Sequence, residues 1–127
     1  MGQSFRSPQI AVIVEDDPDL RELAAALLEE TSLKVVECAS AEAALSVMHA
    51  CGNQVAIIFV DICLPGFMDG VDFAREAHAT WPKAKIVVTS GDPGDRLKSL
   101  PVDTIYMPKP WRANDVLNAA ENARAAM

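Results

Sequence analysis

The chain has 127 residues, half of them hydrophobic, so it is long enough to bury the core of one domain and too apolar for a disordered protein. Its formal net charge of −7 argues against nucleic acid as a direct partner, because contacts to phosphates need clustered lysines and arginines. No apolar run approaches the roughly 20 residues that span a bilayer, so we expect no membrane segment.

The first strand is expected over 9–14, and it leads directly into Glu15, Asp16 and Asp17. Neighbouring carboxylates repel one another, so either water screens these acids or a positive group belongs among them. Asp17 followed by Pro18 is typical of a helix N-cap with proline at the first helical position, and capping alone would explain Asp17. The leucines and alanine that follow recur at helical spacing on one face; they are Leu20, Leu23, Ala24, Leu27 and Leu28.

Beyond this helix, short apolar segments continue to alternate with amphipathic ones. We expect further strands over 34–38, 55–60, 85–90 and 103–107, and further helices over 41–50 and 71–81, within 91–101, and over 112–127. Five repeats of strand and helix with short connections predict an α/β fold, a doubly wound five-stranded parallel sheet with helices on both faces.

The same pattern predicts the domain organisation. We expect a flexible N-terminal tail over 1–8 and one domain over 9–127, with no output domain after the closing helix. Cys38, Cys51 and Cys63 are odd in number and show no paired spacing, so we expect reduced thiols and a cytoplasmic protein instead of a disulfide framework or a zinc site.

Polar residues gather where the predicted strands end. They are Glu15, Asp16, Asp61, Thr89, Ser90 and Lys109. Doubly wound sheets carry out their chemistry outside the carboxyl ends of the strands. For the strand order 2-1-3-4-5, the first and third strands are neighbours, which would bring Asp16 close to Asp61. Carboxylate oxygens are the ligands that Mg²⁺ or Mn²⁺ prefers, and Lys109 would supply the remaining positive charge.

Four motifs, "VEDD", "DICLPG…DG", "VTSG" and "YMPKP", together resemble the receiver domains of bacterial two-component response regulators. The resemblance spans roughly Gln9 to Ala125. It implies a flavodoxin-like fold with strand order 2-1-3-4-5, and a phosphoryl group received from a sensor histidine kinase or a histidine phosphotransfer protein.

The resemblance also implies roles for individual residues. Asp61 would be the phosphoacceptor. Asp16 would bind Mg²⁺ directly, Glu15 through water, and the backbone carbonyl of Cys63 would be a further ligand. Lys109 would form an ion pair with the phosphoryl group.

The remaining implied roles concern the conformational switch. Ser90 would be the switch hydroxyl, with Thr89 as the alternative, because alternation along a strand lets only one of the two face the site. Tyr106 would be the aromatic side chain whose rotamer reports the switch. The peptide bond between Lys109 and Pro110 is usually cis in this family.

The chain departs from the common form of the family at three places. The loop "PGFMDG" carries one residue more than usual, Cys63 places a thiol where many relatives have a polar side chain, and Asp92 places an acid two residues beyond Ser90. We expect Cys63 and Asp92 to tune the lifetime of the aspartyl phosphate.

The leading interpretation is a stand-alone receiver, a phospho-accepting signalling domain and not an enzyme in the usual sense. It would bind an unidentified downstream protein through the face of its fourth helix, fifth strand and fifth helix, as a monomer or a phosphorylation-dependent dimer. One alternative is a phosphatase of the haloacid-dehalogenase type, although Cys63 stands where that family needs a second Asp. The other alternative is a degenerate receiver that binds its partner constitutively.

Overall fold

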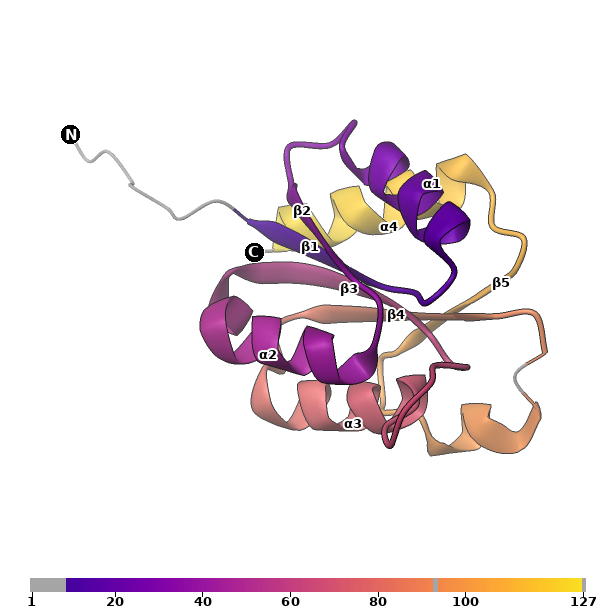
Figure 1. The fold of residues 1–127 in the computed structure, drawn as a ribbon. Helices are drawn as coiled ribbons and strands as arrows, with labels where there is room; N and C mark the ends of the chain where they lie inside the picture. The colour runs from indigo at the N-terminus through magenta and orange to yellow at the C-terminus, as the bar shows by residue number, and fades with distance from the viewer. Residues whose placement is uncertain (1–8, 93, 127) are drawn as a thin grey trace.

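The computed structural model describes residues 9–92 and 94–126, and its five strands form one parallel sheet in the order β2-β1-β3-β4-β5 (Figure 1). The strands are β1 (Ile10–Val14), β2 (Lys34–Cys38), β3 (Val55–Asp61), β4 (Lys85–Ser90) and β5 (Ile105–Pro108). The α-helices are α1 (Pro18–Leu28), α2 (Ala41–Cys51), α3 (Gly70–Thr80) and α4 (Ala113–Ala126), and the 3₁₀ helices are η1 (Gly52–Gln54) and η2 (Gly94–Ser99). The expected tail over 1–8 lies outside the described residues.

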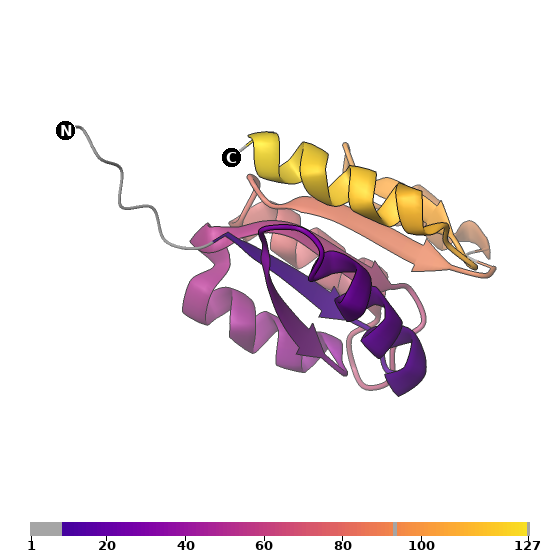
Figure 2. The same cartoon turned by 90° about the horizontal axis from the view of Figure 1, so that it is seen from above.

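Helices cover both faces of the sheet, which confirms the predicted doubly wound architecture. α2 and α3 lie on one face, and α1 and α4 lie on the other (Figures 1 and 2). Successive side chains of each strand enter opposite core layers. Ile58 and Val60 of β3 pack on the side of α2 and α3, whereas Ile57 and Phe59 pack on the side of α1 and α4.

The helices begin where side chains can accept hydrogen bonds from free backbone N–H groups. The Asp17 side chain accepts from the N–H groups of Asp19 and Leu20 at the start of α1, with Pro18 as the first helical residue. The Ser40 side chain caps α2 in the same way, as its sequence position indicated.

The short helix expected within 91–101 is the 3₁₀ segment η2. Two local features differ from the sequence-based expectation. Leu23 is 52% exposed, because α1 turns the small side chains of Ala24 and Ala25 toward the core instead. The fifth strand starts two residues late, because Asp103 adopts a positive φ of 69° in the turn that precedes it.

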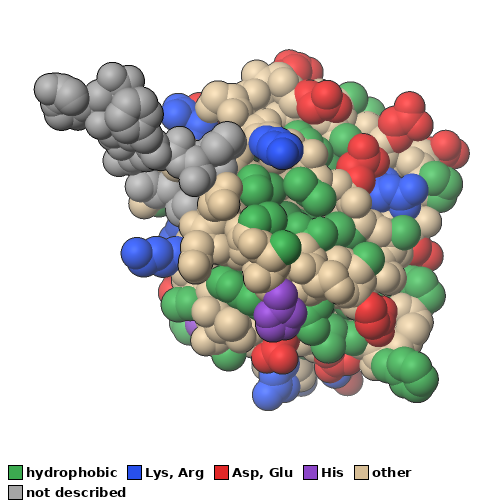
Figure 3. Space-filling model, turned by 60° about the vertical axis from the view of Figure 1, so that its left-hand side comes forward, with side chains coloured by type: hydrophobic (Ala, Val, Ile, Leu, Met, Phe, Trp, Pro, Cys, Tyr) green, Lys and Arg blue, Asp and Glu red, His purple; other side chains and the backbone are tan. Residues whose placement is uncertain are grey.

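The surface mixes apolar and charged groups. Figure 3 shows a face on which hydrophobic side chains gather near the centre, while acidic side chains lie toward the periphery. Among the helices of residues 9–92 and 94–126, none is both long enough and apolar enough to cross a membrane.

Gly70 opens α3 directly against the end of β3. Its N–H donates to the carbonyl of Ile62 at 2.9 Å, and a Cβ at this position would overlap the backbone carbonyl of Asp61. Only glycine allows this close approach, so Gly70 helps to set the position of the backbone that carries Asp61.

We expect Gly70→Ala to lower the free energy of unfolding by about 1–3 kcal/mol, the usual cost of an overpacked site. In an ordinary helix the same change would stabilise the protein by about 0.5–1 kcal/mol. Urea denaturation followed by circular dichroism measures the difference. Gly91→Ala is the matched control, because a Cβ there would meet nothing within 4 Å. Equal stability of the two variants would contradict this account of Gly70.

Candidate functional site

The acids that follow β1 and β3 come together at one edge of the sheet. Glu15 and Asp61 are 4% and 7% exposed, whereas Asp16 is exposed. One carboxylate oxygen of each lies within 4.8 Å of the others. This closeness follows from the pairing of β1 with β3, which the strand order predicted. The structure therefore brings together the three carboxylates that the sequence predicted to meet at the strand ends.

Lys109 neutralises the two buried members of this cluster. Its ammonium group donates to Glu15 Oε1 at 2.7 Å and to Asp61 Oδ2 at 3.1 Å. The backbone N–H of Cys63 donates to the other Asp61 oxygen, Oδ1, at 3.1 Å. Both oxygens of Asp61 are thus held in place, and its carboxylate is oriented by groups from two different loops.

Burial shapes the protonation of this ion pair. Burial raises the pKa of the Glu15 carboxyl, and the hydrogen bonds from Lys109 and from the N–H of Asp17 offset the rise only in part. For Lys109, burial alone would lower the pKa of the ammonium group, but hydrogen bonds to Glu15 and Asp61 outweigh it and raise the pKa. Lys109 therefore stays protonated at neutral pH and supplies a fixed positive charge.

The donor set fits a hard divalent cation. Three carboxylates within reach of one point offer oxygen ligands only, as Mg²⁺ requires, and the exposed side of Asp16 leaves room for the waters that Mg²⁺ retains. Glu15, Asp16 and Asp61 would hold the ion. The expected role of the Cys63 backbone carbonyl as a further ligand remains a prediction.

The end of β4 places two hydroxyls near the cluster. Thr89 and Ser90 are both buried. In the sheet register Thr89 is the partner of Asp61, whereas the Ser90 hydroxyl accepts a hydrogen bond from the N–H of Asp92 at 3.2 Å. Ser90 stays the predicted switch hydroxyl and Thr89 its alternative, since both hydroxyls lie at this edge.

Tyr106 and the residues after β5 also meet this edge. The Tyr106 hydroxyl donates to the carbonyl of Ser90 at 2.9 Å, and the N–H of Lys109 donates to the same carbonyl at 3.1 Å. The bond between Lys109 and Pro110 is cis, as expected. The aromatic ring is therefore tied to the strand end that carries the switch candidates.

Some residues that support the site were missed by sequence reasoning. Arg21 of α1 donates from Nη1 to the carbonyl of Glu15 at 2.8 Å, and its Nε lies 3.6 Å from Glu37 at the end of β2. The spacing of four residues between Asp17 and Arg21 places Arg21 one turn above the helix start, which was the available signal.

The loop after Asp61 is held from two sides. The N–H of Met68 donates to Glu42 Oε2 at 3.1 Å, and Arg96 of η2 binds both oxygens of Asp69 at 2.9–3.0 Å. Asp69 also forms a reciprocal capping box with Asp72 at the start of α3. Glu42 and Arg96 thus anchor the end of the longer loop that leads into α3, while Phe67 beside it is fully exposed.

An apolar hollow of about 330 Å³ adjoins the site. It is lined by Leu20, Leu23, Lys109, Pro110 and Trp111. Trp111 packs against the core layer of α1 and α4, and its indole N–H is buried without a partner among the described residues. Apolar surface is therefore exposed directly beside the carboxylate cluster.

The family assignment follows from comparison with known proteins. The model of the response regulator receiver domain family matches residues 11–121. The chain is 32% identical over 116 residues to the transcriptional regulatory protein AruR of Pseudomonas aeruginosa, covering 87% of this chain and 47% of AruR. The chain belongs to the receiver domain family of response regulators, and it spans about half the length of AruR.

Solved structures agree on the fold. A receiver domain protein from Clostridium thermocellum superposes with a TM-score of 0.80 at 21% identity, covering 91% of this chain and 93% of the other. A CheY-like receiver domain protein from Methanospirillum hungatei gives a TM-score of 0.79 at 24% identity, with coverages of 94% and 97%. These similarities show that the predicted flavodoxin-like fold is shared with receiver domains of known structure. Phosphoryl acceptance in two-component signalling is the general function of this family.

The charge arrangement predicts the effect of Asp16→Asn. Lys109 pairs with Glu15 and Asp61, and Asp16 has no ion pair within residues 9–92 and 94–126. Without Mg²⁺, the variant should therefore be more stable than wild type by about 0.5–1 kcal/mol, because one exposed repulsive charge is removed. With Mg²⁺, its affinity for the ion should fall at least about tenfold, because a ligand is lost.

Thermal unfolding with and without Mg²⁺ measures both effects, since an ion that binds only the folded state raises Tm. Asp19→Asn is the matched control, because it removes an exposed acid of α1 outside the cluster. A metal-free Asp16→Asn protein that unfolds below wild type would show that carboxylate crowding is not the dominant effect here.

Proposed function

We propose that this receiver accepts a phosphoryl group on Asp61 from a histidine kinase or a histidine phosphotransfer protein in a Mg²⁺-dependent reaction. The observation that carries the proposal is the bridge of Lys109 between Glu15 and Asp61, beside the carboxylate of Asp16. The proposal concerns the chemistry of this domain and applies equally to an isolated chain and to a longer protein.

In the proposed reaction a carboxylate oxygen of Asp61 attacks the phosphorus of a phosphohistidine. The N–P bond breaks, and its electron pair stays on the departing imidazole. Transfer of this kind depends mainly on alignment and charge neutralisation. A bound Mg²⁺ would neutralise charge on the phosphoryl oxygens. Lys109 stays at hydrogen-bond distance and takes its share of that charge, while the N–H of Cys63 keeps the Asp61 carboxylate oriented.

The switch would follow from the new phosphoryl oxygens. Ser90, or Thr89 in its place, would donate its hydroxyl to one of them. The Ser90 hydroxyl now accepts a hydrogen bond from the N–H of Asp92, and its proton is free to be donated to a phosphoryl oxygen. The rearranged strand end would change the contacts of Tyr106, which is bound to the carbonyl of Ser90. The change would then reach the surface formed by η2, β5 and α4.

Two surfaces suit the two kinds of partner. The apolar hollow beside Lys109, with the exposed Leu23, suits a phosphodonor protein because it adjoins the phosphoacceptor. The face of η2, β5 and α4 exposes Val102 and Ile105, which suits a downstream protein. We assign the chain to the cytoplasm, where kinases present their phosphohistidines, and we expect a monomer or a phosphorylation-dependent dimer.

The phosphatase alternative has less support. A haloacid-dehalogenase-type enzyme needs an acid two residues after its nucleophile, and Cys63 stands there with its side chain exposed. The chain therefore has no carboxyl group at the position where such an enzyme needs its acid.

The direct test is incubation with acetyl phosphate and Mg²⁺, followed by intact mass. Wild type should gain about 80 Da, the mass of one phosphoryl group, and Asp61→Asn should gain nothing. Mn²⁺ should replace Mg²⁺, and chelation should abolish the gain. Absence of an adduct, together with no effect of Mg²⁺ on Tm, would favour a degenerate receiver that binds its partner constitutively.

The lifetime of the phosphorylated form should depend on Cys63 and Asp92. Both are exposed beside the site, and their backbone N–H groups bind the Asp61 carboxylate and the Ser90 hydroxyl. We propose that their exposed side chains control the access of the attacking water, so Cys63→Ala and Asp92→Ala should each change the dephosphorylation rate about twofold or more, a change of at least about 0.4 kcal/mol in the barrier. Decay of the 80 Da adduct with time measures it. Cys51→Ala, a thiol remote from the site, should decay as wild type does.

A further inference from the structure

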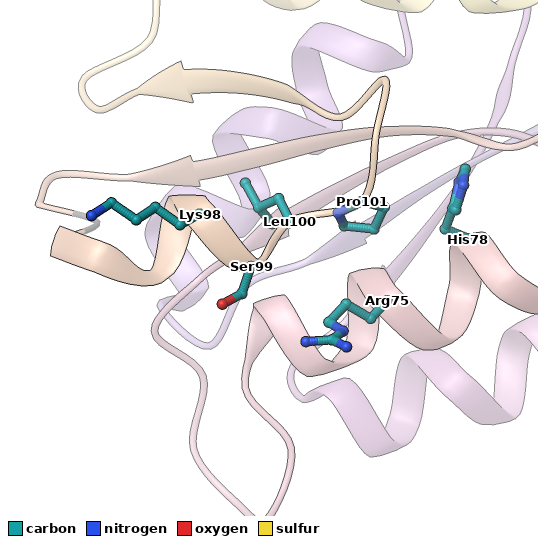
Figure 4. A pocket seen from close by; sticks show the side chains of 6 residues that line it. All are labelled: Arg75, His78, Lys98, Ser99, Leu100 and Pro101. Carbon is teal, nitrogen blue, oxygen red and sulfur yellow. The ribbon is translucent and has the colours of Figure 1, made fainter.

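A groove between α3 and η2 is not used by the phosphoryl chemistry. It has a volume of about 480 Å³ and is lined by Arg75, His78, Lys98, Ser99, Leu100 and Pro101 (Figure 4). The segment that borders it between β4 and β5 holds only the short 3₁₀ helix η2. A second hollow of about 50 Å³ shares His78 with it and adds Lys85 and Thr104.

The groove is basic in a protein whose net charge is −7. Arg75 and Lys98 line it, and no acid does. Within the described chain Arg75 has no ion pair, and Lys98 has only an exposed contact of 3.8 Å with Asp95. Asp103 is the one acid that lines the smaller hollow. Of the two acids of α3, Asp72 pairs with Arg96, whereas Glu76 is exposed and does not line the groove. Positive charge is thus left available for a partner.

The arrangement of these groups fits a chain better than a small anion. In Figure 4 the basic ends of Arg75, His78 and Lys98 do not converge on one point, as they would around a phosphate. Leu100 and Pro101 add apolar surface between them. Thr104 lines the smaller hollow, and its hydroxyl is buried without a hydrogen-bond partner among the described residues.

We propose that the groove between α3 and η2 binds an acidic polypeptide segment of a partner protein. Carboxylates of the segment would pair with Arg75 and Lys98, and one apolar side chain would rest on Leu100 and Pro101. This binding does not require a phosphoryl group on Asp61. It can therefore be tested separately from the proposed function, with the unphosphorylated protein.

The test uses a fluorescein-labelled peptide of twelve residues in which Glu and Asp alternate with Leu, and a second peptide in which Gln and Asn replace the acids. Anisotropy measures the affinity, and ¹⁵N-resolved shifts locate the contact. We expect the acidic peptide to bind, to shift resonances of 75–78 and 98–104, and to bind more weakly as salt rises, because exposed charges are screened.

Matched charge changes decide whether the site is specific. Arg75→Gln with Lys98→Gln should weaken binding about fivefold, as expected for two exposed ion pairs. Lys34→Gln with Arg112→Gln removes the same charge from other surfaces and should leave the affinity within twofold. Asp61→Asn should bind as wild type does. The proposal would be overturned if the acidic peptide does not bind, if the neutral peptide binds equally well, or if both double variants lose affinity equally.

Discussion

One partly buried ammonium group determines how the carboxyl edge of the sheet is built. Glu15 and Asp61 are two buried carboxyl groups that lie side by side, and Lys109 places a positive charge 2.7 and 3.1 Å from them. Lys109 comes from the loop after β5, so the ion pair also links strands that lie apart in the sheet. The run of three acids after β1 divides accordingly, since Glu15 pairs with Lys109, Asp16 faces solvent, and Asp17 caps α1.

The sheet supplies the geometry that this charge arrangement requires. Neighbouring parallel strands have their carboxyl ends at the same edge of the sheet. Residues that are distant in sequence therefore lie close together there. Gly70 adds a constraint of its own, because it lets α3 begin against the carbonyl of Asp61. Asp61 is therefore fixed by its strand, by the helix that follows and by Lys109 opposite.

Much of this was accessible from the sequence because it depends on local patterns. Alternating segments predicted the layers, Asp17 and Ser40 predicted helix starts, and strand ends predicted that Asp16, Asp61 and Lys109 meet. The register between neighbouring strands could not be predicted from the sequence, although a shift of one residue exchanges the two faces of a strand. This is why the pairing of Thr89 with Asp61 emerged only from the structure.

Tertiary packing explains the other differences. The apolar spacing of α1 allowed Leu23 to face inward, but the rotation of a helix depends on its neighbours, and the small Ala25 side chain lets it approach them closely. Arg96 and Asp69 are 27 residues apart in the sequence, so no local sequence pattern indicates their contact. The capping box of Asp69 and Asp72 did have a readable pattern, an acid at the cap and another three residues later.

The positions of the two tryptophans have an optical consequence. Trp81 packs edge-on against His49 and covers Gly52, close to the amino ends of β3 and β4. Trp111 follows Lys109 at the opposite end of the sheet. One indole therefore reports on the surroundings of Lys109 and the carboxylates that it binds, while the other reports on the remote end of the same core. The tryptophan fluorescence of the chain combines emission from Trp111 near Lys109 with emission from the remote Trp81. Replacing Trp81 would leave the emission of Trp111 alone.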